Sequence, residues 1–219
     1  ILGIQDIWAG LIIALSKMSA WERGFHIFWL LGPFVLLIER TPADFWLSVL
    51  VIAFVVRSVL RRQGAWLGVF WVKACFLFLL VCMLSSATSE MPSYAFSESL
   101  AWFRFPLFAM ATVFWLGTDK RLLYAMLLST ALGMFLMTGI LMMEMIVEGQ
   151  KLSRLSWPYG DEVSGNYLAK VGLPAFTVMM ALAVGAKPRL AAIMGGLSFI
   201  SIIMSVLTGE RINFVIRAC

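Results

Sequence analysis

Long apolar runs bounded by charged residues constrain this chain more than any other feature. Seven runs occur, at residues 24–38, 43–56, 65–87, 98–117, 122–147, 166–186 and 190–207. An eighth begins at Ile212. A helix needs about 20 mostly apolar residues to cross a bilayer, so the last five runs are long enough or nearly so. The first two are short and are consistent with a tilted pair or a hairpin, and we expect Pro33 to kink the first.

The composition agrees with a membrane protein. Of the 219 residues, 62% are hydrophobic and 13% are charged, whereas soluble domains are about half apolar and a quarter charged. No soluble core of this length could bury so much apolar surface. We therefore predict an all-α, polytopic transmembrane helix bundle with about 7–8 spans, forming a single transmembrane domain over residues 1–219.

Positive charges predict how the spans are oriented. One set of loops contains nine Lys or Arg residues: Lys17, Arg23, Arg57, Arg61, Arg62, Lys120, Arg121, Lys187 and Arg189. The alternate set contains four: Arg40, Lys151, Arg154 and Arg211. The positive-inside rule makes the nine-charge side cytoplasmic. Loops 88–97 and 148–165, and the corner at 208–211, are then expected on the outside.

Four charged residues from different runs are predicted to share one outer layer. Arg104 lies about 9 Å from the outer end of its run, Lys170 about 6 Å and Glu144 about 5 Å, at 1.5 Å per residue. Arg211 lies at the outer corner itself. Snorkelling of long side chains would explain any one of them. Together they favour a phosphate receptor, so we expect a site for an anionic lipid headgroup that is open to the extracytoplasmic side.

Other polar and sulfur-containing residues give weaker signals. Lys73 falls near the middle of the run 65–87, and its role is open. His26, the only histidine, is expected to pack near the cytoplasmic end of the first run. The Met-rich stretch 136–145 is interpreted as adaptable packing. The spacing of the cysteines matches no metal motif, and we predict no metal, no cofactor and no nucleic-acid partner.

Two short motifs resemble a known family. LTGERINF, at 207–214, resembles the T/S-G-E/S-R motif of the O-antigen ligase and O-antigen polymerase family. VSGNYLAKVGLP, at 163–174, is similar to the loop-to-helix motif that precedes it there. RFPLFAMA, at 104–111, is similar to an earlier helix of these proteins, although less closely.

The resemblance implies an activity and a location. Members are multi-span, metal-independent glycosyltransferases of the bacterial inner membrane that act in lipopolysaccharide biosynthesis of the cell envelope. They use glycans carried on undecaprenyl diphosphate at the periplasmic face. A ligase transfers the glycan to lipid A–core, and a polymerase transfers it to a lipid-linked repeat unit.

The resemblance also assigns residues. Arg211 is expected to bind the diphosphate, with Glu210 orienting it. Arg104 and Lys170, which come from the predicted charged layer and not from the resemblance, are the further candidate substrate-binding residues. The family has a large periplasmic loop after this motif, with an Arg and a His proposed to activate the acceptor. The present sequence ends at Cys219, before that loop. We therefore expect a fragment that is inactive alone, whose general base lies beyond Cys219.

Two other classes of function remain open. One is a flippase or transporter of an anionic lipid or solute, and the other is a non-catalytic membrane scaffold. Transporters are typically built from internal repeats, with sites near the bilayer midplane. No repeat is visible, and the predicted charged layer lies outside the midplane. These two points favour the transferase.

Overall fold

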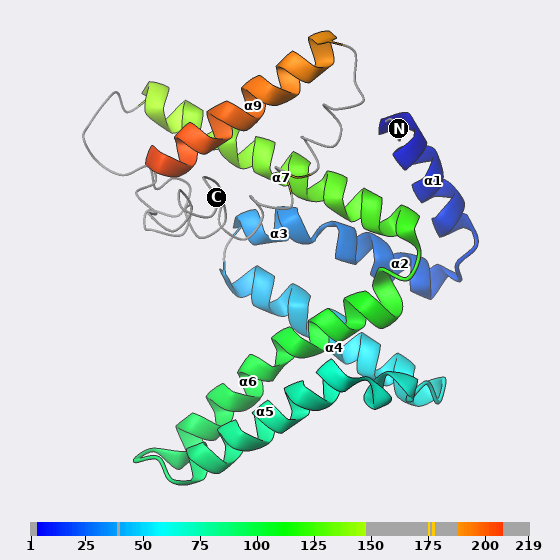
Figure 1. The fold of residues 1–219 in the computed structure, drawn as a ribbon, viewed down its shortest axis with the longest axis vertical. Coiled ribbons are helices and arrows are strands. Elements are labelled where there is room, and N and C mark those ends of the chain that lie inside the picture. Colours follow the sequence, from blue (N-terminus) through cyan, green and yellow to red (C-terminus); the bar gives the residue numbers. More distant parts are fainter. Residues whose placement is uncertain (1–3, 39, 148–174, 176, 178–187, 208–219) are drawn as a thin grey trace. The chain divides into compact units, whose positions relative to one another are not determined.

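The structure is a computed structural model that describes residues 4–38, 40–147, 175, 177 and 188–207. Within these residues every regular element is a helix, as predicted from the apolar runs (Figure 1). The α-helices are α1 (Ile4–Ser16), α2 (Ala20–Leu30), α3 (Gly32–Ile38), α4 (Arg40–Leu60), α5 (Phe70–Ala87), α6 (Pro92–Ala111), α7 (Lys120–Val147) and α9 (Pro188–Leu207). A short 3₁₀ helix, η1 (Ala65–Gly68), precedes α5, and a π-helical turn, η2 (Thr112–Leu116), follows α6.

Four helical segments of the described part are long and apolar enough to cross a membrane. They are Thr41–Leu60, Phe70–Ala87, Pro92–Leu116 and Lys120–Val147, of 20, 18, 25 and 28 residues. They correspond to the second to fifth predicted runs, and α9 corresponds to the seventh. The chain is thus a membrane protein with several transmembrane helices. The sixth run lies outside the described residues, apart from Ala175 and Thr177.

The first predicted run is two helices rather than one. Helix α2 ends at Leu30 and α3 begins at Gly32. Proline has no N–H, so Pro33 cannot donate to the carbonyl four residues earlier, and its ring disfavours a continuous helix. Beyond the break, the N–H of Phe34 donates to the carbonyl oxygen of Leu31 at 3.0 Å. The helix is therefore interrupted at Leu31, two residues before Pro33, where a kink was expected.

Helix α5 begins later than predicted, and this changes the position of Lys73. Residues 65–68 form η1, so α5 starts at Phe70 and Lys73 lies in its first turn. The prediction that Lys73 is near the middle of a span is therefore wrong. Lys73 is exposed, and at a helix end its long side chain can reach the interface.

The chain divides into two compact units. Unit 1 contains Ile1–Pro42 and Arg121–Cys219, and unit 2 contains Ala43–Lys120. The prediction of one transmembrane domain stays a prediction. In unit 1, a core is formed by Leu37 of α3, by Ala131, Met134, Met137 and Leu141 of α7, and by Ala175, with Met142 and Met145 packed against it. This confirms packing for most of the Met-rich stretch; Met143, by contrast, is 64% exposed.

Polar side chains add contacts between the helices of unit 1. The Ser129 hydroxyl on α7 donates to the carbonyl oxygen of Leu30 at 2.6 Å, where α2 ends. The hydroxyls of Thr138 on α7 and Ser201 on α9 are 3.1 Å apart, and both residues are buried. Because buried backbone and hydroxyl groups need partners, these bonds compensate for burial of polar groups.

Unit 2 is built from α4, α5 and α6. Helices α5 and α6 form an antiparallel hairpin (Figure 1). Aromatic pairs line their interface: Phe76–Phe103, Phe78–Trp102 and Trp71–Phe114, with ring centroids 5.1–5.9 Å apart. Helix α4 crosses α6 (Figure 1): Asp44 and Trp46 of α4 contact Arg104 and Phe108 of α6, and Arg57 contacts Trp115 further along.

Candidate functional site

The predicted site is only partly within the described residues. Arg104 and Glu144 are described, whereas Lys170, Glu210 and Arg211 lie outside the described residues. Arg104 belongs to unit 2 and Glu144 to unit 1. Convergence of the four charged residues of the predicted outer layer on one pocket therefore stays a prediction.

Arg104 forms an ion pair with a residue of a neighbouring helix. Its Nη2 donates to Oδ1 of Asp44 on α4 at 2.8 Å. The two side chains are 25% and 36% exposed, so the pair is neither fully buried nor fully in water. A carboxylate at this distance lowers the free-energy cost of placing a guanidinium within an apolar helix, because each charge compensates the other.

The guanidinium of Arg104 is also held by an aromatic ring. Its Cζ lies 5.2 Å from the centroid of the Phe105 ring, within the range of a cation–π interaction. Its Nε is buried and has no hydrogen-bond partner among the described residues. An arginine has five N–H donors, so a guanidinium oriented by Asp44 can still donate to an oxyanion. The arrangement thus allows Arg104 to bind a phosphate oxygen while Asp44 fixes its direction.

Asp44 was missed by the sequence reasoning, which did not include this carboxylate in the predicted outer layer. A usable signal existed. The loop charges place Arg40 on the outside, and Asp44 is the second residue of the run 43–56. These two facts together predict that Asp44 lies near the same outer level as Arg104, on a run of the same direction. A search for carboxylates at matching depth would have found the pair.

Glu144 and His26 belong to unit 1. Glu144 is 8% exposed and lies three residues before the end of α7, at the position expected from the sequence. His26 is 2% exposed, and its Nδ1 lies 2.7 Å from the carbonyl oxygen of Glu22, one turn earlier. This confirms a packing role for His26.

Comparison of the chain with family models, curated proteins and solved structures gives no match. The resemblance to O-antigen ligases and polymerases therefore depends on the motifs at 163–174 and 207–214. What this resemblance implies about the activity of the chain is therefore a proposal.

Proposed function

We propose that this chain is an integral membrane glycosyltransferase of the O-antigen ligase or polymerase type, which transfers glycan from a lipid-linked donor. The proposal depends most on the sequence Thr-Gly-Glu-Arg at 208–211, which directly follows the apolar run 190–207. The second motif, at 163–174, precedes that run. Arg211 and Glu210 come from the first motif. Lys170 comes from the second, and Arg104 from α6.

The proposed reaction transfers a glycan from undecaprenyl diphosphate to an acceptor hydroxyl on lipid A–core or on a lipid-linked repeat. The bond between the anomeric carbon and the diphosphate oxygen breaks, and a bond to the acceptor oxygen forms. The acceptor proton passes to a base, and the electron pair of the broken bond leaves on the diphosphate. Negative charge therefore grows on the diphosphate in the transition state.

Fixed guanidinium and ammonium groups suit this chemistry. Donors that are already oriented stabilise developing charge more than they stabilise the ground state, so they lower the barrier. Arg104 is already oriented, as such a donor must be, because its Nη2 lies 2.8 Å from Oδ1 of Asp44. Arginine also binds a phosphate in a planar, bidentate way that lysine cannot reproduce.

The test is glycan transfer by the whole protein, purified in detergent, from an undecaprenyl-diphosphate-linked glycan. We expect Arg211→Lys to lower the transfer rate by about a hundredfold, the size of effect seen when one oriented donor is lost. Arg154→Lys, in the predicted outer loop 148–165, is the matched control and should retain transfer.

Near-normal transfer by the Arg211→Lys protein would contradict the proposal. The transporter alternative gives a different result. In sealed vesicles a transporter would move the lipid-linked glycan across the membrane unchanged, and no new glycosidic bond would form.

A further inference from the structure

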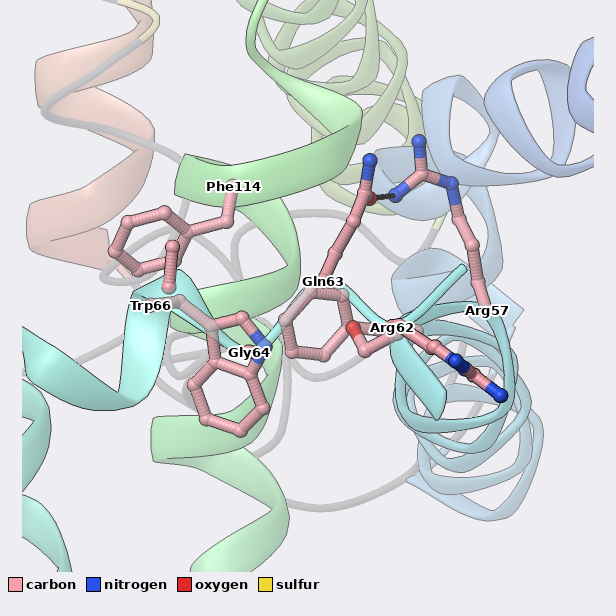
Figure 2. Close-up of a pocket in the computed structure, with 9 residues that line it drawn as sticks. Arg57, Arg62, Gln63, Gly64, Trp66 and Phe114 are labelled. Atoms are coloured by element: carbon pink, nitrogen blue, oxygen red, sulfur yellow. Dashed lines mark hydrogen bonds between the residues drawn. The ribbon is translucent and has the colours of Figure 1, made fainter. Parts of the chain in front are cut away.

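A cavity of about 450 Å³ lies within unit 2, where α4 ends. It is lined by Phe54, Arg57, Ser58, Arg62, Gln63, Gly64, Ala65, Trp66 and Phe114. These residues come from the end of α4, the connection to η1, η1 itself and η2. Figure 2 shows the two arginines on one side of this group, and Trp66 and Phe114 on the other. The cavity is therefore amphipathic.

The backbone at Arg62 is unusual. Helix α4 ends in a Schellman motif: the N–H of Gln63 donates to the carbonyl oxygen of Ser58 at 2.9 Å, and that of Arg62 to Val59 at 3.1 Å. The residue in the left-handed position of this motif is usually glycine. Here it is Arg62, with φ of 51°. Left-handed backbone is unfavourable for a residue with a Cβ, because the Cβ comes too close to the following carbonyl oxygen. The helix end would form more easily with glycine at position 62.

Arg57 is fixed in the wall of the cavity. Its Nη1 donates to Oε1 of Gln63 at 2.7 Å, which is the dashed line in Figure 2. Its Cζ lies 5.5 Å from the centroid of the Trp115 ring. Arg57 therefore provides a positive charge whose position is set by two neighbouring groups.

Aromatic rings form the opposite wall. The Trp66 ring packs against Phe54 on one side and Phe76 on the other, with centroids 5.3 and 6.5 Å apart. Phe114 stacks on Trp71 with an interplanar angle of 10°. Phe114 is in the π-helical turn η2, where the N–H of Gly117 donates to Thr112 at 2.7 Å. Single π turns inside helices occur frequently at functional sites.

Charge and exposure indicate what kind of ligand the cavity suits. Two of the nine lining residues are arginines, and none of the nine has a carboxylate. Next to them in the chain, Val59, Leu60 and Phe70 are 70%, 77% and 85% exposed. A cationic hollow beside exposed apolar side chains suits a ligand with an anionic head and a hydrocarbon tail. Arginine binds phosphate oxygens well, and aromatic rings pack against apolar groups.

We infer that this cavity binds the phosphate headgroup of an anionic phospholipid, with Arg57 in its wall and the exposed Arg62 at its rim as the two ligand-binding cations. The headgroup lies on the arginine side, and the start of the acyl chains lies against Trp66 and the exposed apolar residues. The positive-inside rule places this end of α4 in the cytoplasmic leaflet, where anionic lipids attract basic segments.

This site is separate from the proposed transfer site. Asp44 and Arg57 are 13 residues apart on α4, which corresponds to about 20 Å along a helix. The ion pair of Asp44 with Arg104 and the cavity are thus near opposite ends of α4. The lipid site does not depend on the proposed glycan transfer, and failure of one leaves the other intact.

The experiment is a binding titration of the whole protein, purified and delipidated in detergent, followed by native mass spectrometry. The probes are dioleoyl phosphatidylglycerol, dioleoyl phosphatidylcholine and inorganic phosphate. We expect phosphatidylglycerol to bind more tightly than the other two. The variant Arg62→Gly should weaken its binding about tenfold, since one strong charge-assisted contact is lost. This variant should fold at least as well as the wild type, because glycine adopts the left-handed backbone freely.

Arg61→Gln is the matched control, because it removes one exposed positive charge from the adjacent position, which does not line the cavity. It should change phosphatidylglycerol binding less than about twofold, as expected for a solvent-screened charge. Equal losses in Arg61→Gln and Arg62→Gly would overturn the inference in favour of a general electrostatic attraction. Equal binding of phosphatidylcholine, or inorganic phosphate binding as tightly as phosphatidylglycerol, would overturn it as well.

Discussion

The ion pair between Arg104 and Asp44 allows a quantitative prediction. Exposed ion pairs contribute about 0.2–1 kcal/mol to stability, whereas breaking a buried pair costs about 3–5 kcal/mol. The side chains here are 25% and 36% exposed, and the nitrogen and oxygen are 2.8 Å apart. We therefore expect a coupling energy of about 1–2 kcal/mol, between these limits.

The assay is a double-mutant cycle with Asp44→Asn, Arg104→Gln and the double variant. Asp44→Asn keeps the shape of the side chain and one acceptor oxygen but leaves the guanidinium charge uncompensated. The free energy of unfolding would be measured for each purified protein by SDS titration in detergent micelles. The destabilisation of the double variant should be smaller than the sum of the two single effects by the coupling energy.

A second cycle serves as the control. Asp44→Asn combined with Arg61→Gln should be additive, because Arg61 lies about 25 Å further along the helix direction and sites so far apart are independent. A coupling below about 0.3 kcal/mol between Asp44 and Arg104 would be within additivity. That result would refute the argument that the pair stabilises α4 against α6.

The same variants separate a structural role of Arg104 from a role in substrate binding. If Arg104 only holds the helices together, the double variant should recover glycan transfer along with stability. If Arg104 binds the diphosphate, as proposed, the double variant should recover stability while transfer stays low. The informative measurement is therefore transfer activity compared at equal folded fraction.

Two further predictions concern hydrogen bonds in unit 1. Ser129→Ala should destabilise the protein by about 1–3 kcal/mol in the same unfolding assay, because the partly buried carbonyl oxygen of Leu30 loses its hydroxyl donor at 2.6 Å. An unchanged free energy of unfolding would mean that water or another group replaces the hydroxyl. Thr138→Val and Ser201→Ala should show a coupling energy of about 0.6 kcal/mol in a double-mutant cycle, which is typical of hydrogen bonds between membrane helices. Strict additivity would show that the 3.1 Å contact between the two hydroxyl oxygens contributes nothing to stability.

Sequence alone predicted several features correctly because they depend on local composition. The all-α class and the second, third, fourth, fifth and seventh apolar helices follow from run length and hydropathy, which a bilayer selects directly. Packing of Met137, Met142 and Met145 follows from their place in an apolar run.

Helix boundaries were less predictable. The break between α2 and α3 and the late start of α5 depend on where backbone hydrogen bonds find partners. The hydropathy of a run does not show which groups its backbone hydrogen bonds will pair with. Lys73 was misplaced for this reason, since an apolar run does not show that its first residues form a separate turn.

The candidate sites were decided mainly by tertiary structure. Arg104 could be singled out from the sequence, because a charge inside an apolar run is conspicuous. Its partner Asp44 is 60 residues away in the chain. The cavity likewise required Arg62 and Trp66 from one connection and Phe114 from a turn about 50 residues later. Hydropathy and charge are properties of each residue and its neighbours, whereas ion pairs and cavities are properties of side chains that meet only when helices pack.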